Sequence, residues 1–234
     1  GTQMKATGEV MSIGRTFEES LLKAIRSLET GVFHLYMEKF DEKTREELLS
    51  YIKAGTDDRI FAVAQLLRLG CNVQQIAFET KIDGFFLEKM KKIIEMENML
   101  KANPWNRDVL HEAKRGGFSD RAVAWLWNTD EDTVFRIRKE MHLFPVYKMI
   151  DTCASVFDSY VPYFYSTYEE ENESIAEDRK KILVLGSGPI RIGQGVEFDY
   201  STVHAVKTIR NAGYEAIVIN NNPETVSTDY TTSD

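Results

Sequence analysis

Apolar residues recur at helical spacing through much of the chain, beginning near residue 17. Thr16 and Glu19 form a capping-box pattern ahead of the first apolar stripe. We therefore expect a helix there, in which the Thr16 hydroxyl and the Glu19 carboxylate satisfy free backbone amides. The segment 6–14 is short and bounded by glycine, which indicates an extended segment or loop.

Between residues 41 and 142 the helix signals repeat. Apolar stripes follow residue types that commonly cap helix starts, namely Asp57, Asn72, Asp83, Asn106, Ser119 and Thr129. Gly70 is expected to end the helix that opens at Asp57. Short amphipathic helices must pack on one another to bury their stripes, so this region is predicted to be an all-α domain. It has no fixed repeat period, which disfavours a solenoid.

The pattern changes after residue 156. An aromatic run covers 157–168, and an acidic run at 169–173 is typical of a solvated linker. The continuous apolar run 182–185 predicts a strand buried on both faces. A glycine-rich loop, a helix around Tyr200 to Asn211, a stop at Gly213 and a second strand at 216–219 complete a β-α-β unit. A parallel sheet normally has more strands, so we expect the chain to be an excised portion of a longer protein.

Composition and charge exclude several classes. The chain has 234 residues, of which 43% are hydrophobic and 28% charged, as in an ordinary globular protein. Its net charge of -8 disfavours binding to nucleic acid and to anionic membranes. Cys71 and Cys153 form no C-x-x-C pair, which fits a reducing, cytoplasmic compartment, and no apolar stretch is long enough to span a membrane. The four histidines have no metal-ligand spacing, so packing or surface roles are expected.

The loop 186–195 is the strongest local signal for chemistry. Glycines between a strand and a helix let the backbone approach an anion. However, Arg191 occupies the last glycine position of the dinucleotide fingerprint, and the G-K-[ST] ending of a P-loop is absent. The second strand ends in Asn220, Asn221 and Asn222, where a dinucleotide site would have an acidic residue. A tight turn with purely structural glycines therefore remains an alternative.

Residues 119–141 resemble a helix-turn-helix, which is a competing hypothesis. The second helix carries Arg136, Arg138 and Lys139 but starts with three acidic residues, 130–132, which would face phosphates. The positive and negative charges between residues 106 and 142 balance, so nucleic-acid binding is disfavoured. The pairs Phe85–Phe86 and Trp125–Trp127 are candidates for an interaction surface, although core packing is the commoner role of such pairs.

Longer stretches resemble one family. Residues 181–200 and 222–230 are similar to the opening of a synthetase half in the large chain of carbamoyl-phosphate synthase, and the form of 194–198 resembles the second half. Residues 8–19 resemble the end of the first half. Residues 145–154 and 165–169 resemble the helical oligomerisation domain between the halves and its exit. These parts follow the family's order and cover essentially the whole chain.

The resemblance implies a fold of class α plus α/β. Residues 1–30 would be the C-terminal end of the first ATP-grasp domain, and residues 31–168 the helical oligomerisation domain. Residues 169–180 would be a linker, and residues 181–234 a truncated β-α-β of a Rossmann-like pre-ATP-grasp domain.

The family makes carbamoyl phosphate from bicarbonate, ammonia and two ATP molecules. The resemblance implies a glutamine amidotransferase small subunit as the source of ammonia, ATP with Mg²⁺ or Mn²⁺ as cofactors, and a product used in arginine or pyrimidine biosynthesis. The metal-binding carboxylates and nucleotide-binding lysines would lie outside this chain. The fragment is therefore expected to bind no cofactor, to be inactive, and to link the two halves while self-associating through the helical domain.

On the same resemblance, the loop would help to line the second synthetase site. The residues concerned are Gly186, Gly188, Arg191, Gly193, Gln194, Gly195 and Glu197. No residue is assigned as catalytic or as a metal ligand. The alternative function is a stand-alone helical interaction module.

Overall fold

The computed structural model describes residues 10–151, 156, 160–189, 199–223 and 225–234. The chain divides into two compact units. The helical unit comprises Arg15–Arg26 and Thr30–Phe144, and the α/β unit comprises Gly1–Gly14, Ser27–Glu29 and Pro145–Asp234. This division confirms the expected fold class of a helical domain followed by a small α/β part.

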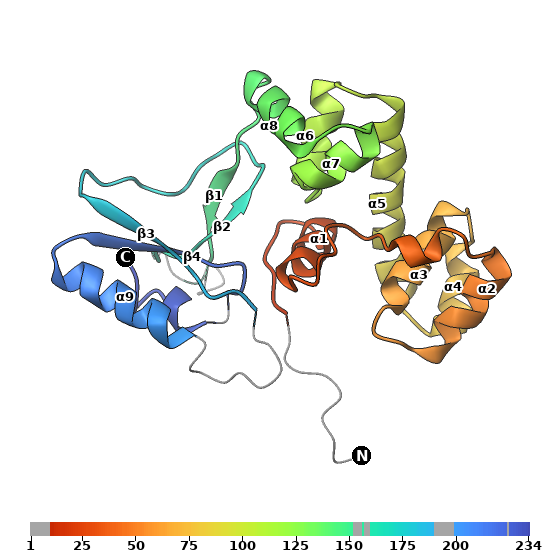
Figure 1. The fold of residues 1–234 in the computed structure, drawn as a ribbon, viewed down its shortest axis with the longest axis horizontal. Coiled ribbons are helices and arrows are strands. Elements are labelled where there is room, and N and C mark those ends of the chain that lie inside the picture. The colour runs from red at the N-terminus through yellow and green to blue at the C-terminus, as the bar shows by residue number, and fades with distance from the viewer. Residues whose placement is uncertain (1–9, 152–155, 157–159, 190–198, 224) are drawn as a thin grey trace, which may run out of the picture. The chain divides into compact units, whose positions relative to one another are not determined.

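In the helical unit, short helices pack around one long helix, α5, which contacts α3, α4, α6 and α7 (Figure 1). The helices are α1 (Phe17–Ser27, whose last residue falls in the α/β unit), α2 (Arg45–Tyr51), α3 (Arg59–Arg68), α4 (Val73–Thr80), α5 (Gly84–Ala102), α6 (Arg107–Arg115), α7 (Asp120–Trp127) and α8 (Glu131–Glu140). Two 3-10 turns lie at Glu38–Phe40 and Ile52–Ala54. One continuous core includes Leu22, Phe40, Leu48, Leu66, Ile76, Leu87, Ile93, Leu100 and Leu110.

Most predicted helix caps are confirmed, and two are displaced by one residue. Asn72, Asp83, Asn106 and Ser119 each accept a backbone N–H of the first turn that follows. The cap of α3 is Asp58 rather than Asp57, and the Asp58 carboxylate makes no cap bond because it accepts the Tyr51 hydroxyl at 2.8 Å.

Asp130, not Thr129, caps α8 by accepting the Thr133 N–H at 2.7 Å. The Thr129 N–H donates instead to the Ala124 carbonyl, which closes the end of α7. Thr129 is therefore part of the preceding helix terminus.

The predicted capping box at the start of α1 forms only in part. The Glu19 N–H donates to Thr16 Oγ1 at 3.2 Å, but the Glu19 carboxylate accepts the N–H of Arg15, one residue before the cap, at 2.7 Å. A complete capping box, which the sequence analysis did not single out, joins Thr44 and Glu47 at the start of α2. Gly70 follows the end of α3 with φ +73°, as expected of a glycine stop.

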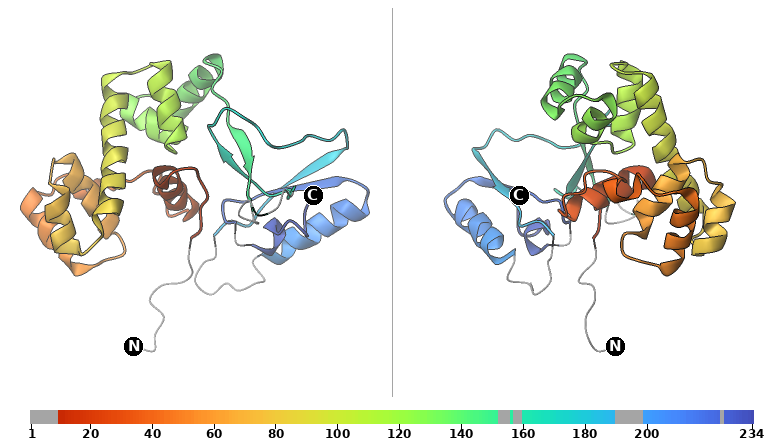
Figure 2. Two further views of the ribbon diagram at one scale, coloured as in Figure 1. Left: turned by 180° about the vertical axis from the view of Figure 1, so that it is seen from behind. Right: turned by 45° about the vertical axis from the view of Figure 1, so that its right-hand side comes forward.

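In its described residues the α/β unit contains two two-stranded sheets. Strands β1 (Val146–Met149) and β2 (Phe164–Thr167) form an antiparallel pair that the sequence analysis did not anticipate, within residues it placed in the helical domain. Strands β3 (Lys181–Leu185) and β4 (Glu215–Ile219) are parallel and are joined through α9 (Tyr200–Asn211), which confirms the predicted β-α-β. Helix α9 packs against both strands, as two views show (Figures 1 and 2).

The predicted burial of β3 on both faces is wrong. Leu183 and Leu185 are 55% and 75% exposed, and within the strand only Val184 is partly buried. A strand pair that packs against one helix can shelter little more than one of its faces. The apolar run therefore predicted the strand correctly but not its burial.

The acidic run at 169–173 makes more ordered contacts than a free linker would. Asn172 Oδ1 accepts the Tyr147 N–H at 2.9 Å, and the Glu173 N–H donates to the Tyr147 carbonyl at 2.8 Å. Glu173 also accepts the Met149 N–H at 2.7 Å and pairs with Lys148 at 2.9 Å. These contacts satisfy backbone groups along one edge of β1, which would otherwise be open.

Candidate functional site

The polar site of the α/β unit lies where β3 and β4 end. The turn after β3 (186–189) and the turn after β4 (described at 220–223 and 225–229) both bond to Asp199, which directly precedes α9, and Gly188 bonds to Asn220. In open α/β sheets, ligands bind outside the carboxyl ends of the parallel strands. We call Ser187, Asp199, Asn220, Thr225 and Ser227 the strand-end cluster.

Asn220 fixes the backbone of the glycine-bearing turn. Its Oδ1 atom accepts the N–H groups of Gly188 and Asn222, each at 3.2 Å, and its Nδ2 atom donates to Thr225 Oγ1 at 3.2 Å. A Cβ atom on Gly186 would lie 2.5 Å from Asn220 Cγ, closer than real Cβ contacts. Glycine at position 186 is thus required by the side chain packed beside it.

Two of the seven predicted loop residues lie in the described part of the chain. Gly186 and Gly188 both lie beside Asn220, and Gly188 has φ +79°, a conformation that favours glycine. The other five lie outside the described residues: Arg191, Gly193, Gln194, Gly195 and Glu197.

Asp199 occupies the cap position of α9 without capping it. Its carboxylate, in a residue only 1% exposed, accepts the Ser227 N–H at 2.6 Å, the Ser227 hydroxyl at 2.8 Å and the Ser187 hydroxyl at 3.3 Å. These bonds satisfy a charged group that would be costly to bury alone. Sequence reasoning gave Asp199 no role and noted Asn220 only because it is not acidic. The signal that could have found them is their place, since Asp199 directly precedes α9 and Asn220 directly follows β4.

Hydroxyl groups continue the cluster through the turn after β4. Thr225 Oγ1 lies 3.3 Å from Ser227 Oγ and 3.1 Å from Thr228 Oγ1. Thr228 donates to the Thr225 carbonyl at 2.8 Å, and the Tyr163 hydroxyl donates to the Pro223 carbonyl at 2.8 Å. Side-chain bonds therefore hold this turn in one conformation.

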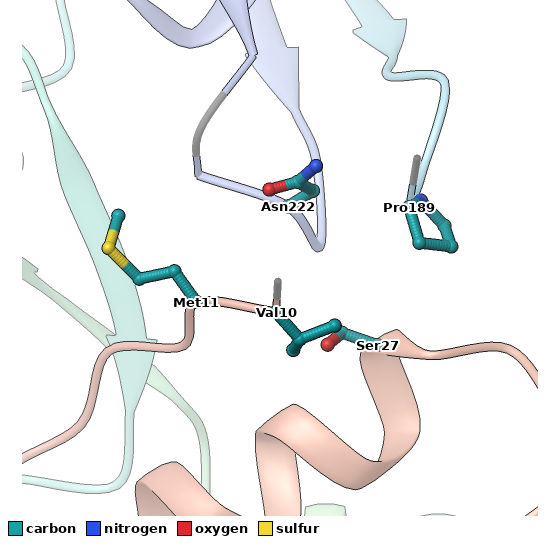
Figure 3. A pocket seen from close by; sticks show the side chains of 5 residues that line it. All are labelled: Val10, Met11, Ser27, Pro189 and Asn222. Atoms are coloured by element: carbon teal, nitrogen blue, oxygen red, sulfur yellow. The ribbon is translucent and has the colours of Figure 1, made fainter. Parts of the chain in front are cut away.

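A shallow hollow lies next to the cluster (Figure 3). It is lined by Val10, Met11, Ser27, Pro189 and Asn222, and it is too small to enclose a water molecule. Among the described residues, no group of three or more His, Cys, Asp and Glu side chains is placed to hold a metal ion. What the cluster can do chemically is to position the backbone of the two turns.

The helical unit contains two buried charge networks. In the first, His34 Nε2 lies 2.8 Å from Glu97 Oε1, and Arg68 donates to both Glu97 oxygens at 2.6 and 2.9 Å. Burial lowers the pKa of His34, against the opposing effect of Glu97. Burial alone would raise the pKa of Glu97, but the bonds from Arg68 and His34 lower it overall. His34 thus has the expected packing role, and its buried side chain is hydrogen-bonded to Glu97.

The second network joins α6, α7 and α8. Asp120 accepts Lys114 Nζ at 2.8 Å and the guanidinium of Arg138 at 3.0–3.1 Å. Burial lowers the pKa of Lys114 to about 8, although Asp120 opposes this shift. Arg138 also donates to the Leu143 carbonyl at 2.8 Å.

These contacts bear on the helix-turn-helix hypothesis. Helices α7 and α8 are joined by a tight turn in which Asn128 has φ +54°, as in such motifs. However, Arg138, one of the three basic residues that would face nucleic acid, is buried and bound to Asp120. The geometry of helices α7 and α8 therefore fits packing within the helical unit.

The two aromatic candidates differ in exposure. Trp127 is buried and donates to the Leu100 carbonyl at 2.9 Å, and Trp125 packs against His34 and Tyr36. Phe85 and Phe86 are 57% and 44% exposed. Their rings lie 5.4 Å apart and contact the ring of Phe17 at 6.3 and 5.4 Å, and we call these three residues the Phe patch.

Two family models match the chain. The model described as the oligomerisation domain of the carbamoyl-phosphate synthetase large chain matches residues 9–142. The model described as the carbamoyl phosphate synthase preATP-grasp domain matches residues 178–234. The first match covers more than half of the chain and includes α1. The second contains the strand-end cluster. No helix in the described residues is long and apolar enough to cross a membrane.

Proposed function

We propose that this chain acts as a segment of a carbamoyl-phosphate synthase, because it belongs to the carbamoyl-phosphate synthetase large-chain family. The observation that carries this proposal is the match of both domain models, in sequence order, to one chain. In this role the helical unit and the α/β unit link the two synthetase halves. The whole enzyme would make carbamoyl phosphate from bicarbonate, ammonia and two ATP molecules, for arginine or pyrimidine biosynthesis.

The segment's own part in this reaction is to shape a site. ATP with Mg²⁺ or Mn²⁺ would supply the phosphoryl group and neutralise its charge. The carboxylates that bind the metal and the lysines that bind the nucleotide would come from other parts of the enzyme. The turn at 186–189, with Arg191, Gly193, Gln194, Gly195 and Glu197 after it, would line the second synthetase site. A glutamine amidotransferase small subunit would deliver the ammonia.

Replacing Gly186 by alanine tests this assignment. The new Cβ would displace the Asn220 side chain, and with it the bond to the Gly188 N–H. In the synthase polypeptide that contains these residues, we expect carbamoyl-phosphate synthesis from ammonia, bicarbonate and MgATP to fall about 100-fold, because small displacements at a reacting site are that costly.

Gly84→Ala is the matched control, since nothing lies within 4 Å of a Cβ at that position. Normal synthesis by Gly186→Ala would remove the turn from the site. An inactive wild-type polypeptide would refute the proposed function itself, and synthesis by the 234-residue chain alone would refute its role as an inactive segment.

We propose a second role for the helical unit, self-association with another copy through the Phe patch. This unit matches a model described as an oligomerisation domain, and the patch leaves three neighbouring rings without full burial. Lys89 and Glu18 form an ion pair of 3.5 Å beside it. A two-fold contact needs a self-complementary surface, and adjacent charges of both signs meet that condition.

Phe85→Glu should therefore weaken self-association at least about tenfold, since it buries a charge in place of a ring. An acidic residue near the start of α5 is compatible with the helix dipole, so the fold should persist. Sedimentation equilibrium at several concentrations measures the effect. Phe78→Glu, at an exposed residue of α4 outside the patch, is the control. An unchanged association constant, or a wild-type chain that stays monomeric, would contradict this role.

A further inference from the structure

We infer that Asp199 is a positioning residue of the second synthetase site, an inference that rests on the proposed function. Its carboxylate joins the turn after β3 to the turn after β4 at the position directly before α9. It thereby sets the place of the glycine-bearing turn against which substrate would lie.

The bonds of Asp199 run between elements and not within its own helix. A capping aspartate would accept an N–H from the first turn of α9, and Asp199 makes no such bond. It accepts instead from Ser227, 28 positions along the chain, and from Ser187, 12 positions before it. Local helix stability does not explain this arrangement, whereas a fixed distance between the two turns does.

The charge of Asp199 is buried for a geometric purpose. The three donors that we find on it are two serine hydroxyls and one backbone amide, all of them neutral. Hydrogen bonds to a carboxylate are shorter and stronger than neutral ones, and the bond from the Ser227 N–H is 2.6 Å long. Both carboxylate oxygens bond to Ser227, one to its N–H and the other to its hydroxyl, which fixes that residue in place.

Asp199 and Asn220 form hydrogen bonds to neighbouring residues of the same turn. Asp199 binds the side chain of Ser187, and Asn220 binds the backbone N–H of Gly188. Two consecutive residues are thus held from two elements, α9 and the end of β4. Loss of either hydrogen bond would let the turn shift. A displacement of about 1 Å at a reacting site can slow a reaction about 100-fold.

Two substitutions separate position from charge. Asp199→Ala removes all three bonds. Asp199→Asn keeps the shape, since its oxygen can accept the Ser227 N–H while its NH₂ donates to the hydroxyl oxygens of Ser227 and Ser187. We would measure phosphoryl transfer from carbamoyl phosphate to ADP, which yields ATP and carbamate and reverses the second-half reaction. Bicarbonate-dependent ATP hydrolysis in the same polypeptide reports the first half.

We expect Asp199→Ala to lower kcat for this transfer about 100-fold with KM for ADP changed less than about threefold. Asp199→Asn should restore kcat to within about fivefold of wild type. Ser227→Ala, which removes one hydroxyl donor, should give an intermediate loss. First-half hydrolysis should be unchanged in all three. Glu177→Gln, which removes an exposed carboxylate that lies before β3 and pairs with exposed Arg179, is the charge control and should match wild type.

An unchanged kcat in Asp199→Ala would overturn the inference. An Asp199→Asn variant as slow as Asp199→Ala would also overturn it, because charge and not position would then matter. A loss of both activities would show general damage to the fold and would equally count against it. If the wild-type polypeptide transfers no phosphoryl group from carbamoyl phosphate to ADP, the proposed function fails instead.

Discussion

Replacing Asp120 by asparagine is expected to lower the free energy of unfolding of the helical unit by about 3–5 kcal/mol. The carboxylate of Asp120 is the shared partner of Lys114 and Arg138, whose side chains are only 5% and 8% exposed. Asparagine would remove the negative charge that both buried cations bind, while the two cations stay next to each other. At this size of protein, a loss of that magnitude lowers Tm by about 10 °C.

Tryptophan fluorescence in urea is a suitable measurement, because all three tryptophans, 105, 125 and 127, lie in the helical unit. Asp108→Asn is the matched control. It also removes a carboxylate from the first turn of a helix, but that side chain is 90% exposed and its ion pair is with exposed Arg107. A loss below about 1 kcal/mol, the range of surface pairs, would contradict the prediction.

The pH dependence of stability in the Asp120→Asn variant gives a second test of this network. Lys114 has a pKa of about 8 in the folded protein against an ordinary value of 10.5. Above pH 8 the unfolded chain therefore retains a proton that folded Lys114 has released, so stability rises with pH up to about 10.5. Without Asp120 the pKa of Lys114 should fall further, and the variant should recover part of its loss between pH 7 and pH 9. Lys114→Met in the same background should recover it at pH 7.

Local signals in the sequence predicted the helices well and failed where tertiary contacts competed. The caps at Asn72, Asp83, Asn106 and Ser119 depend on bonds within one turn, which the sequence displays directly. Asp58 differs because its carboxylate is taken by Tyr51 on the preceding helix. A capping pattern shows which groups are able to bond but not which distant donor reaches them first.

The strands show a similar limit. The apolar run of β3 and the stop at Gly213 were enough to predict the β-α-β, because both are local features. The pair β1–β2 was missed because each strand has only four residues, and its register joins residues 15 to 21 positions apart. The predicted burial of β3 was wrong because burial depends on which layers cover the sheet.

At the strand-end cluster, the sequence predicted the glycines but not what holds them. Gly186 and Gly188 follow from the motif between strand and helix. Their partner Asn220 lies 32 positions beyond Gly188, and the Ser227 bond to Asp199 spans 28. A single sequence carries no periodic signal for such pairs. The buried networks are similar, since His34 and Glu97 are 63 positions apart.

Acidification from pH 7 to pH 5 is expected to weaken the helical unit chiefly through His34. The ring is fully buried, its Nε2 bonds to Glu97, and its Nδ1 has no partner among the described residues. Since Glu97 is an acceptor when ionised, Nε2 carries the proton and Nδ1 is unprotonated. Burial lowers the pKa of His34 below its ordinary value of 6.5, because a second proton, on Nδ1, would place a positive charge and an unpaired N–H in the core.

The direction of the effect follows from proton binding. Below pH 6.5 the unfolded chain takes up a proton at His34, while the folded unit does not until its lower pKa is reached. The unfolded state thus binds more protons, and stability falls as pH falls, by up to about 1.4 kcal/mol per pH unit for one group. Glu97 adds a loss of the same sign below its ordinary pKa of 4.5, because its folded pKa is lowered as well.

His34→Gln isolates the histidine contribution, because glutamine can still donate to Glu97 but takes up no proton. Urea midpoints read by tryptophan fluorescence at pH 7.5, 6.5, 5.5 and 5.0 should fall steeply for the wild type and much less for this variant. His142→Asn removes an exposed histidine at φ +56°, a conformation that asparagine tolerates, and should keep the wild-type slope. Equal slopes in wild type and His34→Gln would assign the acid sensitivity to other groups, whereas a flattened slope in His34→Gln alone would show that one buried imidazole sets the stability of this unit near neutral pH.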